Sequence, residues 1–596
     1  MTELNFKGKE FVYNHHLAVP FRPLVPDESK GIGPVALDGN LIVHGDNLHA
    51  LKALLPLYAG KVDCIFIDPP YNTGNEGWAY NDNVNAPMIR EWLESNPIGI
   101  EDGLRHDKWC AMMWPRLRLL HELMCDEGLI FITIDNNEQH RLRSMLDEIF
   151  GDRSFVAEIA WQKSYSPSND AGGIDPLHDT IFVYSKIENA AVALLDRTEK
   201  QDNAYKNSDN DPRGPWKAGD STRAEHRDYA FYPIETPSGK IVYPADGRSW
   251  VFTKEELPNL IEQNLLYFGV KGDAKPSIKQ FLTKVKQGLT PTTWWPYTET
   301  GHNDQAKKEV KRILSGELPF QTPKPLGLLR RIVALVENND AIFLDSFAGS
   351  ATTAHAVLEA NKRDGGNRRF ILVEMEDYAD KMTAERVRRA INGYAFTGTQ
   401  RTELLRDKLT WIKLKNADKL TESVEAIENL HGHEYDAIRK TVKDGELIVT
   451  GEKAVKDKTE GLGGSFTYCT LGDPVELDKV LSGETLPPFD GLGSVLFHMA
   501  TARAFDPAAM REDDFYLGAV EGQHVWLIYK PDLDWLKSPD AALTLKRAKS
   551  FAETDPNARH LVFAPARYVS QKMLAEQNIP VEFVPLPFAL YRIDRS

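Results

Sequence analysis

Short apolar runs alternate with helical patterns along the first 150 residues. Three runs read as buried strands, each stopped by a polar or turn residue: 41–46 (LIVHGD), 62–68 (VDCIFID) and 128–135 (GLIFITID). Apolar positions recur at helical spacing in three intervening segments: 47–60, 109–124 and 138–150. This alternation predicts a parallel sheet with helices on both faces.

The pattern loosens between about residue 153 and residue 320, where Tyr, Trp, Gly, Pro and Asn crowd together as in loops and turns. Strand–helix–strand alternation returns within 341–376, with apolar runs at 341–345 and 370–376. We therefore expect an irregular region inserted into an α/β fold. The strand 341–345 is expected beside the strand that ends at Asp68.

A further region follows residue 400. The stretch 451–464 (GEKAVKDKTEGLGG) is interpreted as a flexible connector because it is polar and rich in glycine. Apolar runs and helical patterns then alternate again from 524 to 586. This rhythm predicts a small α/β domain near the end of the chain.

Length and composition fit a multidomain globular protein. A chain of 596 residues is expected to form three or four domains, and its 42% hydrophobic and 27% charged residues are ordinary. We find no apolar run of about 18 residues and no secretory signal pattern. The four cysteines lack CxxC spacing, which argues against a disulfide framework and a structural zinc site. We expect a cytoplasmic protein of a bacterium or archaeon.

The net charge of −16 argues against bulk electrostatic attraction to nucleic acid. It does not exclude nucleic-acid binding, because a duplex responds only to the protein face that it meets.

The first motif whose residues could form a reactive site is Asp-Pro-Pro-Tyr-Asn-Thr-Gly at 68–74, directly after a buried strand. Ligands of open α/β sheets gather at the carboxyl ends of strands. Two prolines stiffen this loop and leave carbonyls free to accept hydrogen bonds. With Asp68 as a second acceptor and Tyr71 as a ring, the loop could hold a planar exocyclic amine. The alternative is a strand that ends in a proline-rich turn.

The second motif is Asp-Ser-Phe-Ala-Gly-Ser-Ala-Thr-Thr at 345–353, between a strand and a helix. Small residues there let backbone N–H groups approach a ligand closely. The motif is not GxGxxG and lacks a phosphate-binding lysine, so a helix N-cap is the alternative. Glu374 ends the next strand, 29 residues after Asp345, where acidic side chains commonly bind ribose hydroxyls.

Together these segments resemble the amino-methyltransferases of DNA that use S-adenosylmethionine. The catalytic motif precedes the cofactor loop, with a variable region between them, and this permuted order resembles the β class. HGDN (44–47) and TPKP (322–325) resemble the family's cofactor-side segments. DPPYNTG, GPWKAGD and NDQAKKEVKRIL are most similar to the modification subunits of type III restriction systems. Ala351 departs from the family, where many members have glycine.

The resemblance, from about residue 38 to 398, implies a Rossmann-like S-adenosylmethionine-dependent methyltransferase fold in the permuted β-class order, with an inserted target-recognition domain and an additional C-terminal α/β domain. The implied domains are an N-terminal arm (1–37), a catalytic half (38–152), a target-recognition region (153–320), a cofactor-binding half (321–400) and a C-terminal interaction domain (401–596).

The resemblance also implies methyl transfer to the exocyclic nitrogen of a flipped base, with an aspartate in the motif favouring adenine N6. The implied catalytic residues are Asp68, Pro69, Pro70 and Tyr71. The implied cofactor-binding residues are Asp46, Lys324, Asp345, Phe347, Gly349, Ser350 and Glu374. Asp345 would receive the methionine ammonium and Glu374 the ribose. No metal is implied.

Five lysines lie within sixteen residues of the irregular region: Lys271, Lys275, Lys279, Lys284 and Lys286. A later basic cluster follows: Lys307, Lys308, Lys311 and Arg312. For a DNA enzyme these residues predict phosphate contacts, whereas a solvated helix face is the alternative.

The resulting hypothesis is an adenine-specific DNA methyltransferase that serves as the modification and recognition subunit of a type III-like restriction or defence system. Its expected partners are double-stranded DNA, a second copy of the chain, and a separate ATP-dependent helicase/nuclease subunit. The alternatives are a solitary epigenetic methyltransferase and a DNA-binding scaffold whose methylation activity is vestigial.

Overall fold

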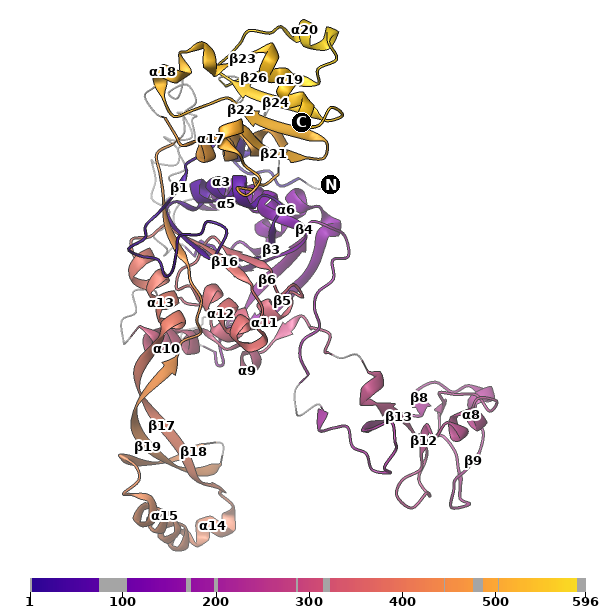
Figure 1. Cartoon of the computed structure of the whole chain (residues 1–596). Coiled ribbons are helices and arrows are strands. Elements are labelled where there is room, and N and C mark those ends of the chain that lie inside the picture. Colours follow the sequence, from indigo (N-terminus) through magenta and orange to yellow (C-terminus); the bar gives the residue numbers. More distant parts are fainter. Residues whose placement is uncertain are drawn as a thin grey trace. The chain divides into compact units, whose positions relative to one another are not determined.

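The computed structural model of the chain describes residues 3–73, 104–167, 173–197, 202–285, 288–314, 322–443, 445–474, 486–501 and 503–586 (Figure 1). Contacts between residues divide the chain into two compact units. One unit combines 1–191 with 292–596, and the other comprises 192–291. Lys286 and Gly74, the last residue of DPPYNTG, lie outside the described residues.

A ten-stranded mixed sheet forms the centre of the first unit as far as the structure describes it. In spatial order its strands are β1 (Leu24–Pro26), β20 (Thr467–Leu471), β2 (Leu41–His44), β16 (Arg369–Glu374), β15 (Ile342–Asp345), β3 (Val62–Ile67), β4 (Met124–Ile134), β6 (His178–Ser185), β5 (Phe155–Gln162) and β14 (Trp294–Trp295). The strands from β20 to β4 are parallel to one another. Because β15 pairs with β3, the expected neighbour of the Asp68 strand is confirmed.

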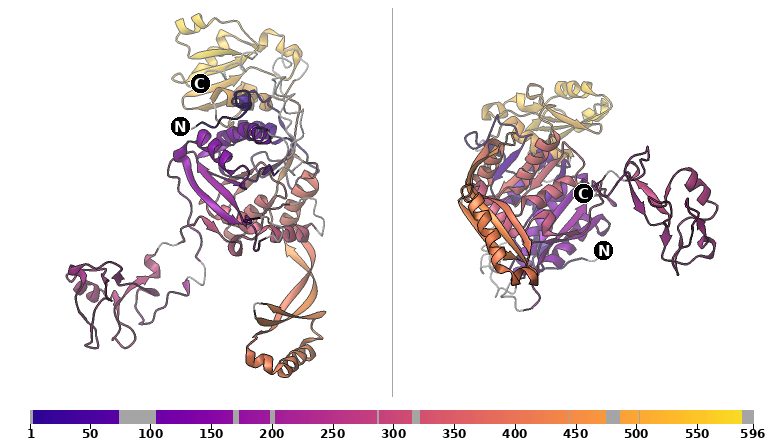
Figure 2. Two further views of the ribbon diagram at one scale, coloured as in Figure 1. Left: turned by 180° about the vertical axis from the view of Figure 1, so that it is seen from behind. Right: turned by 90° about the horizontal axis from the view of Figure 1, so that it is seen from below.

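Helices cover both faces of this sheet. Figures 1 and 2 show α3 (Asn47–Tyr58), α5 (Arg105–Leu123) and α6 (Gln139–Phe150) on one face, with α11 (Leu326–Ala334) and α12 (Thr352–Asp364) on the other.

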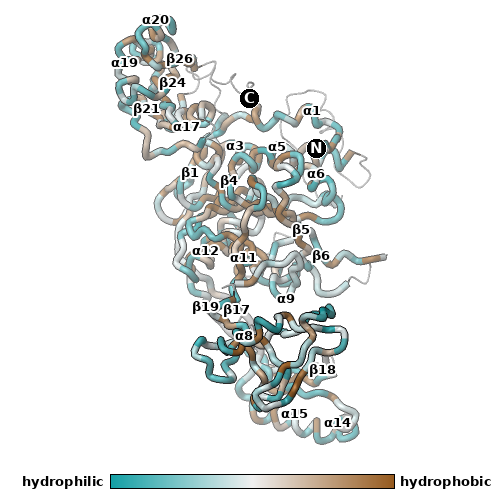
Figure 3. Tube along the Cα trace, turned by 90° about the vertical axis from the view of Figure 1, so that its right-hand side faces the viewer, coloured by the Kyte–Doolittle hydropathy of each residue, from teal (hydrophilic) through white to brown (hydrophobic). Residues whose placement is uncertain are grey.

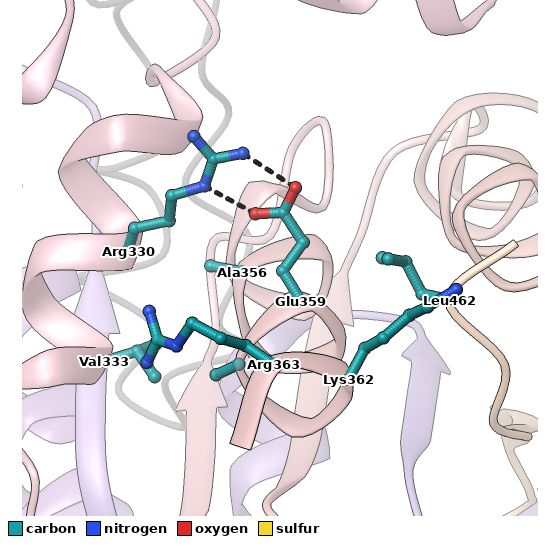
Figure 4. A pocket seen from close by; sticks show the side chains of 8 residues that line it. Arg330, Val333, Ala356, Glu359, Lys362, Arg363 and Leu462 are labelled. Atoms are coloured by element: carbon teal, nitrogen blue, oxygen red, sulfur yellow. Dashed lines mark hydrogen bonds and ion pairs between the residues drawn. The ribbon is translucent and has the colours of Figure 1, made fainter. Parts of the chain in front are cut away.

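Alternation along the strands explains why two helical layers form. Ile65 and Ile67 of β3 belong to the core beneath α3 and α5, whereas Cys64 and Phe66 point to the opposite face and are buried as well. Figure 3 shows hydrophobic and hydrophilic positions interleaved along these elements, as helix-on-sheet packing requires. Each buried isoleucine contributes about 1.5–3 kcal/mol to folding. The predicted Rossmann-like α/β fold is confirmed.

The boundaries expected for the inserted region need correction. Strands β5 and β6 form an antiparallel pair that extends the central sheet, and β14 pairs with β5, although all three lie within 153–320. The separate unit is therefore 192–291. The apolar run in β6 was hidden by the polar, glycine-rich loops around it.

The expected boundary at residue 401 is also wrong. Strand β20 returns to the central sheet beside β2, and β1 of the N-terminal arm pairs with β20. The supposed connector at 451–464 lies largely in β19 (Glu446–Glu460), which pairs over its length with β17 (Gly393–Lys408). Backbone pairing, which polar residues also support, makes this segment a strand. The antiparallel ribbon formed by β17 and β19 (393–460) also includes β18 (Ala437–Lys443), α14 (Trp411–Lys415) and α15 (Ala417–His431).

The small α/β domain near the end of the chain is confirmed. Strands β22 (Gln523–Leu527), β24 (Arg559–Ala564) and β26 (Val581–Pro585) are parallel, and β21 (Tyr516–Val520) pairs antiparallel with β22. Helices α19 (Leu545–Thr554) and α20 (Gln571–Glu576) connect the parallel strands. Across the described ranges of the chain, no helix is both long and apolar enough to cross a bilayer.

Unit 192–291 has a core of its own around the buried Trp250. Its three-stranded sheet has the order β12 (Leu266–Tyr267), β13 (Ser277–Phe281) and β7 (Trp216–Gly219). Two short antiparallel pairs complete it: β8 (Thr222–Arg223) with β11 (Ser249–Trp250), and β9 (Ile234–Glu235) with β10 (Ile241–Val242).

Candidate active site

Asp68 lies directly after β3, at the carboxyl edge of the parallel strands. The register of β3 and β4 pairs Ile67 with Ile132, which brings Thr133 beside Asp68. The Thr133 hydroxyl donates to Asp68 Oδ1 at 2.5 Å, and the Lys324 ammonium forms an ion pair with Oδ2. Both oxygens of the carboxylate are therefore fixed in direction by residues from two other segments.

The loop after Asp68 is held from two sides. The Trp109 indole N–H of α5 donates to the Pro70 carbonyl at 2.7 Å. Asn72 has a left-handed backbone (φ 59°), a conformation that asparagine tolerates better than most residues. Its amide donates to the buried Glu138 carboxylate at 2.5 Å. These contacts make the turn rigid in a way that its prolines alone do not.

Tyr71 is half-buried next to Asp68. Its hydroxyl donates to Asp179 Oδ2 at 3.3 Å, and Lys163 Nζ contacts Asp179 Oδ1 at 2.6 Å. The Lys324 ammonium lies 5.2 Å from the centre of the Tyr71 ring, within the range of a cation–π contact. Burial, together with the Asp179 and Asp68 carboxylates, raises the pKa of the phenol well above its usual value. Tyr71 is thus a neutral hydrogen-bond donor.

Asp345 ends β15, the strand next to β3. Its carboxylate accepts from the Phe347 backbone N–H at 3.1 Å and from the Thr353 hydroxyl at 2.6 Å. Only 3% of the residue is exposed, and burial raises the pKa of the carboxyl to about 7. A buried carboxylate with two neutral donors and no paired cation among its described contacts is suited to a cationic ligand.

Glu374 ends β16, adjacent to β15. Its oxygens accept from the backbone N–H groups of Gly349 at 2.7 Å and Glu376 at 3.0 Å. Burial raises the pKa of Glu374. The register pairs Asp345 with Leu372, two residues before Glu374, so the two carboxylates stand at neighbouring strand ends.

Arg386 is a residue that sequence reasoning missed. It lies in α13 (Glu385–Asn392) and is fully buried behind the loop after β15. Its Nη1 donates to Ser350 O at 3.0 Å, Ser350 Oγ at 3.1 Å and Thr352 Oγ1 at 2.8 Å. The Thr352 hydroxyl in turn donates to the Lys324 carbonyl at 3.1 Å. Arg386 therefore links this loop to the segment that carries the partner of Asp68.

The expected cofactor residues come together at one edge of the sheet because β2, β16, β15 and β3 are parallel. Asp46 follows β2 and caps α3, because its Oδ1 accepts a hydrogen bond from the His49 backbone N–H at 3.1 Å. Its Oδ2 lies 3.5 Å from Arg116 Nη2. The loop after β15 supplies Phe347, Gly349 and Ser350. Lys324 contacts Asp68, a partner that sequence reasoning did not identify.

Burial separates the proposed DNA-binding lysines. Lys271, Lys275 and Lys284 are exposed, as are Lys308, Lys311 and Arg312 of α10 (Asn303–Ile313), whereas Lys307 is half-buried. Lys279 is 4% exposed, and its ammonium contacts Asp209 at 2.5 Å and Asp211 at 2.9 Å. The expectation that Lys279 contacts phosphate is therefore wrong, because its charge is buried and already paired.

Replacing Lys279 by methionine is expected to lower the stability of unit 192–291. Asp211 would lose a charged hydrogen bond, worth about 1.5–3 kcal/mol, although Arg213 still contacts it at 2.7 Å. Thermal unfolding followed by calorimetry measures this loss. The exposed Lys275→Met is the matched control and should unfold like the parent. Equal stability of both variants would contradict a structural role for Lys279.

The described segments contain no group of three or more His, Cys, Asp or Glu side chains placed to hold a metal ion. The carboxylates Asp68, Asp345 and Glu374 each have their own donors instead.

Comparisons with known proteins show which family this chain resembles. A family model described as DNA methylase matches residues 62–385, more than half of the chain. The Mod subunit of the type III restriction-modification enzyme StyLTI of Salmonella typhimurium is 33% identical over 63% of this chain and 58% of its own length. The type III EcoPI Mod subunit of Escherichia phage P1 is 30% identical over 57% of this chain and 58% of its own length. The type II methyltransferase M.KpnI of Klebsiella pneumoniae is 30% identical over 58% of this chain and 83% of its own length. The chain thus spans less than two thirds of the two Mod subunits.

Proposed function

Because the chain belongs to the DNA methylase family, we propose that it is a site-specific DNA methyltransferase that transfers a methyl group from S-adenosylmethionine to adenine N6. The observation that carries the proposal is the meeting of Asp68 with the carboxylates Asp345 and Glu374 at the ends of three adjacent parallel strands. A methyl acceptor and a methyl donor need this proximity for direct transfer.

The residues at the ends of β15 and β16 fit the cofactor. S-adenosylmethionine supplies an activated methyl group on a sulfonium. Asp345 would accept hydrogen bonds from the ammonium of the cofactor, since this carboxylate is buried beside neutral donors. Glu374 would accept hydrogen bonds from the ribose hydroxyls while it also holds the Gly349 backbone N–H in place. Phe347 and Ser350 would line the methionine part, and Asp46 would contribute from the adjacent strand end.

Asp68 would bind the exocyclic amine of an extruded adenine. The amine is a poor nucleophile because its lone pair is delocalised into the ring. Hydrogen bonds to Asp68 and to the Pro69 carbonyl would favour sp³ character and aim the lone pair at the methyl group. Orientation of this kind supplies up to about 7–11 kcal/mol of barrier reduction. Tyr71 would stack on the base, which is worth about 1–3 kcal/mol.

We further propose that this chain is the modification subunit of a type III-like restriction or defence system. The relatives named Mod subunits support this assignment. Double-stranded DNA, a second copy of the chain and a separate ATP-dependent restriction subunit would be its partners. Unit 192–291 would read the target sequence, with Lys271, Lys275 and Lys284 toward phosphates.

Single-molecule sequencing of DNA from a methylation-free host that expresses the chain tests the function. N6-methyladenine in one short motif, absent with Asp68→Ala, is the expected result. A mark that appears only when neighbouring genes are added would support an obligate assembly. A mark from the chain alone, with no companion restriction activity, would favour a solitary methyltransferase. No mark under either condition would favour the scaffold alternative.

The raised pKa of Asp345 gives a pH-dependent prediction. With a pKa of about 7, this carboxyl is increasingly protonated as the pH falls below 7, and only the ionised form pairs with an ammonium. Affinity for S-adenosylmethionine should therefore decrease as the pH falls from 7 to 5.5, with a slope that approaches about a tenfold loss per pH unit. Isothermal titration calorimetry checks this slope. Asp345→Asn should bind more weakly with a flatter profile, and an unchanged slope in that variant would assign the titration to another group.

A further inference from the structure

Asp179 is a buried carboxylate for which the proposed chemistry has no use. It lies near the start of β6 and is 2% exposed. Strand register places it opposite Trp161 of β5, and Lys163, just beyond the end of β5, contacts its Oδ1 at 2.6 Å. The other oxygen accepts from Tyr71 at 3.3 Å. The carboxylate thus joins the wall of the site to the ring of the catalytic motif.

Burying a charge is costly unless it is paired and hydrogen-bonded. Lys163 meets the first requirement by its ion pair with Oδ1, and the Tyr71 hydroxyl meets the second by donating a hydrogen bond to Oδ2. An apolar residue at 179 would fill the space beside Trp161 without this cost. The arrangement therefore has a role beyond packing.

Three constraints define how the Tyr71 ring lies. The hydroxyl hydrogen bond fixes the far end of the ring, while the rigid backbone between Asp68 and Asn72 fixes the near end. The Lys324 ammonium, 5.2 Å from the ring centre, fixes the tilt by its attraction to the ring face. Without the Asp179 contact, the far end of the ring would lose its hydrogen bond, while the rest of the ring still packs against the core.

We propose that Asp179 is a positioning residue that holds the Tyr71 ring in the plane on which the extruded adenine stacks, with Lys163 keeping Asp179 aimed at the phenol. This inference rests on the proposed function and adds a specific dependence of catalysis on the Tyr71 hydroxyl. A misplaced ring would misplace the base relative to Asp68. Such errors reduce the rate of transfer more than the affinity for DNA.

A double-mutant cycle on the full chain tests the proposal. The variants are Tyr71→Phe, Asp179→Ala and the pair, with kcat and KM measured from transfer of labelled methyl groups to duplex DNA. Each single variant should lower kcat by about tenfold or more, and KM should change by less than about threefold. The pair should be no worse than either single variant, because both remove the same hydrogen bond.

Further variants separate positioning from folding. Asp179→Asn retains an oxygen acceptor for the phenol and should recover most of the activity. Glu158→Ala, an exposed carboxylate on β5, is the matched control and should behave like the parent. Fluorescence of 2-aminopurine at the target position reports stacking, and its emission should rise in Asp179→Ala and in Tyr71→Phe but not in Asp179→Asn. If Asp179→Ala fails to fold, the comparison of Tyr71→Phe with Asp179→Asn still decides the question.

The outcomes distinguish two failures. A parent chain that transfers no methyl group to DNA overturns the proposed function and this inference with it. If the parent is active and the kcat losses of the two single variants multiply in the double variant, only the proposed role of Asp179 is overturned. A Tyr71→Phe variant with the parent's kcat overturns the same role.

Discussion

Replacing Asp68 by asparagine is expected to lower methyl transfer by at least about 100-fold, the scale on which loss of one well-placed transition-state contact is felt. Asparagine is nearly isosteric with aspartate but directs an amide NH₂ at one of its two contacts, Thr133 or Lys324, and carries no charge to attract the amine hydrogens. Cofactor affinity should stay within about threefold, because Asp345 and Glu374 are untouched. Transfer of labelled methyl groups and calorimetric titration of the cofactor measure the two effects.

This substitution also removes the counterion of Lys324, whose side chain is 9% exposed. The double variant Asp68→Asn, Lys324→Met removes the unpaired ammonium and should unfold at a higher temperature than Asp68→Asn alone. It should remain inactive. Recovery of activity in the double variant would mean that transfer needs neither the carboxylate nor the ion pair, and that the unpaired ammonium alone caused the loss in Asp68→Asn.

Replacing Arg386 by methionine should weaken cofactor binding by about ten- to a hundredfold, equivalent to about 1.4–2.7 kcal/mol. The three acceptors on Ser350 and Thr352 would lose their common donor, and the loop after β15 would no longer be held in one arrangement. Global stability should change less than binding, because the substitution also removes a buried cation that lacks a carboxylate partner among its described contacts. Calorimetric titration and thermal unfolding separate these effects.

Arg388→Met is the matched control, because Arg388 lies on the same helix but contacts Asp380, Glu385 and the Lys30 carbonyl instead of the loop after β15. It should bind the cofactor like the parent. Equal weakening by both substitutions would indicate a general disturbance of α13. Unchanged affinity in Arg386→Met would show that the loop needs no such support.

The sequence predicted what depends on local pattern. Apolar runs and the order of the motifs predict the strands that end at Asp68, Asp345 and Glu374. They also predict that these strands are neighbours in the sheet. Thr133 could also have been found, since a parallel register of 62–68 with 128–135 brings it beside Asp68.

Other features depend on tertiary contacts that no local pattern encodes. Arg386 lies more than thirty residues after its loop, in a helix where an arginine ordinarily faces solvent. Lys279 belongs to a closely spaced series of lysines, and only the fold shows that Asp209 and Asp211 surround it. Strand β20 is five residues long and follows a glycine-rich stretch, so its pairing partner could not be inferred from alternation.

The position of β20 has a consequence for how the chain matures. Because β20 lies between β2 and β1, the ribosome must synthesise residue 471 before the sheet can close on that side. Until then, the nascent methylase half presents β2 as an open edge, which is a site for unwanted strand pairing. A gene truncated after residue 400 would keep every catalytic motif and make that exposed edge permanent. The ribbon 393–460, by contrast, leaves and returns to the same side of the sheet, so evolution can lengthen or shorten it without breaking the register of the strands.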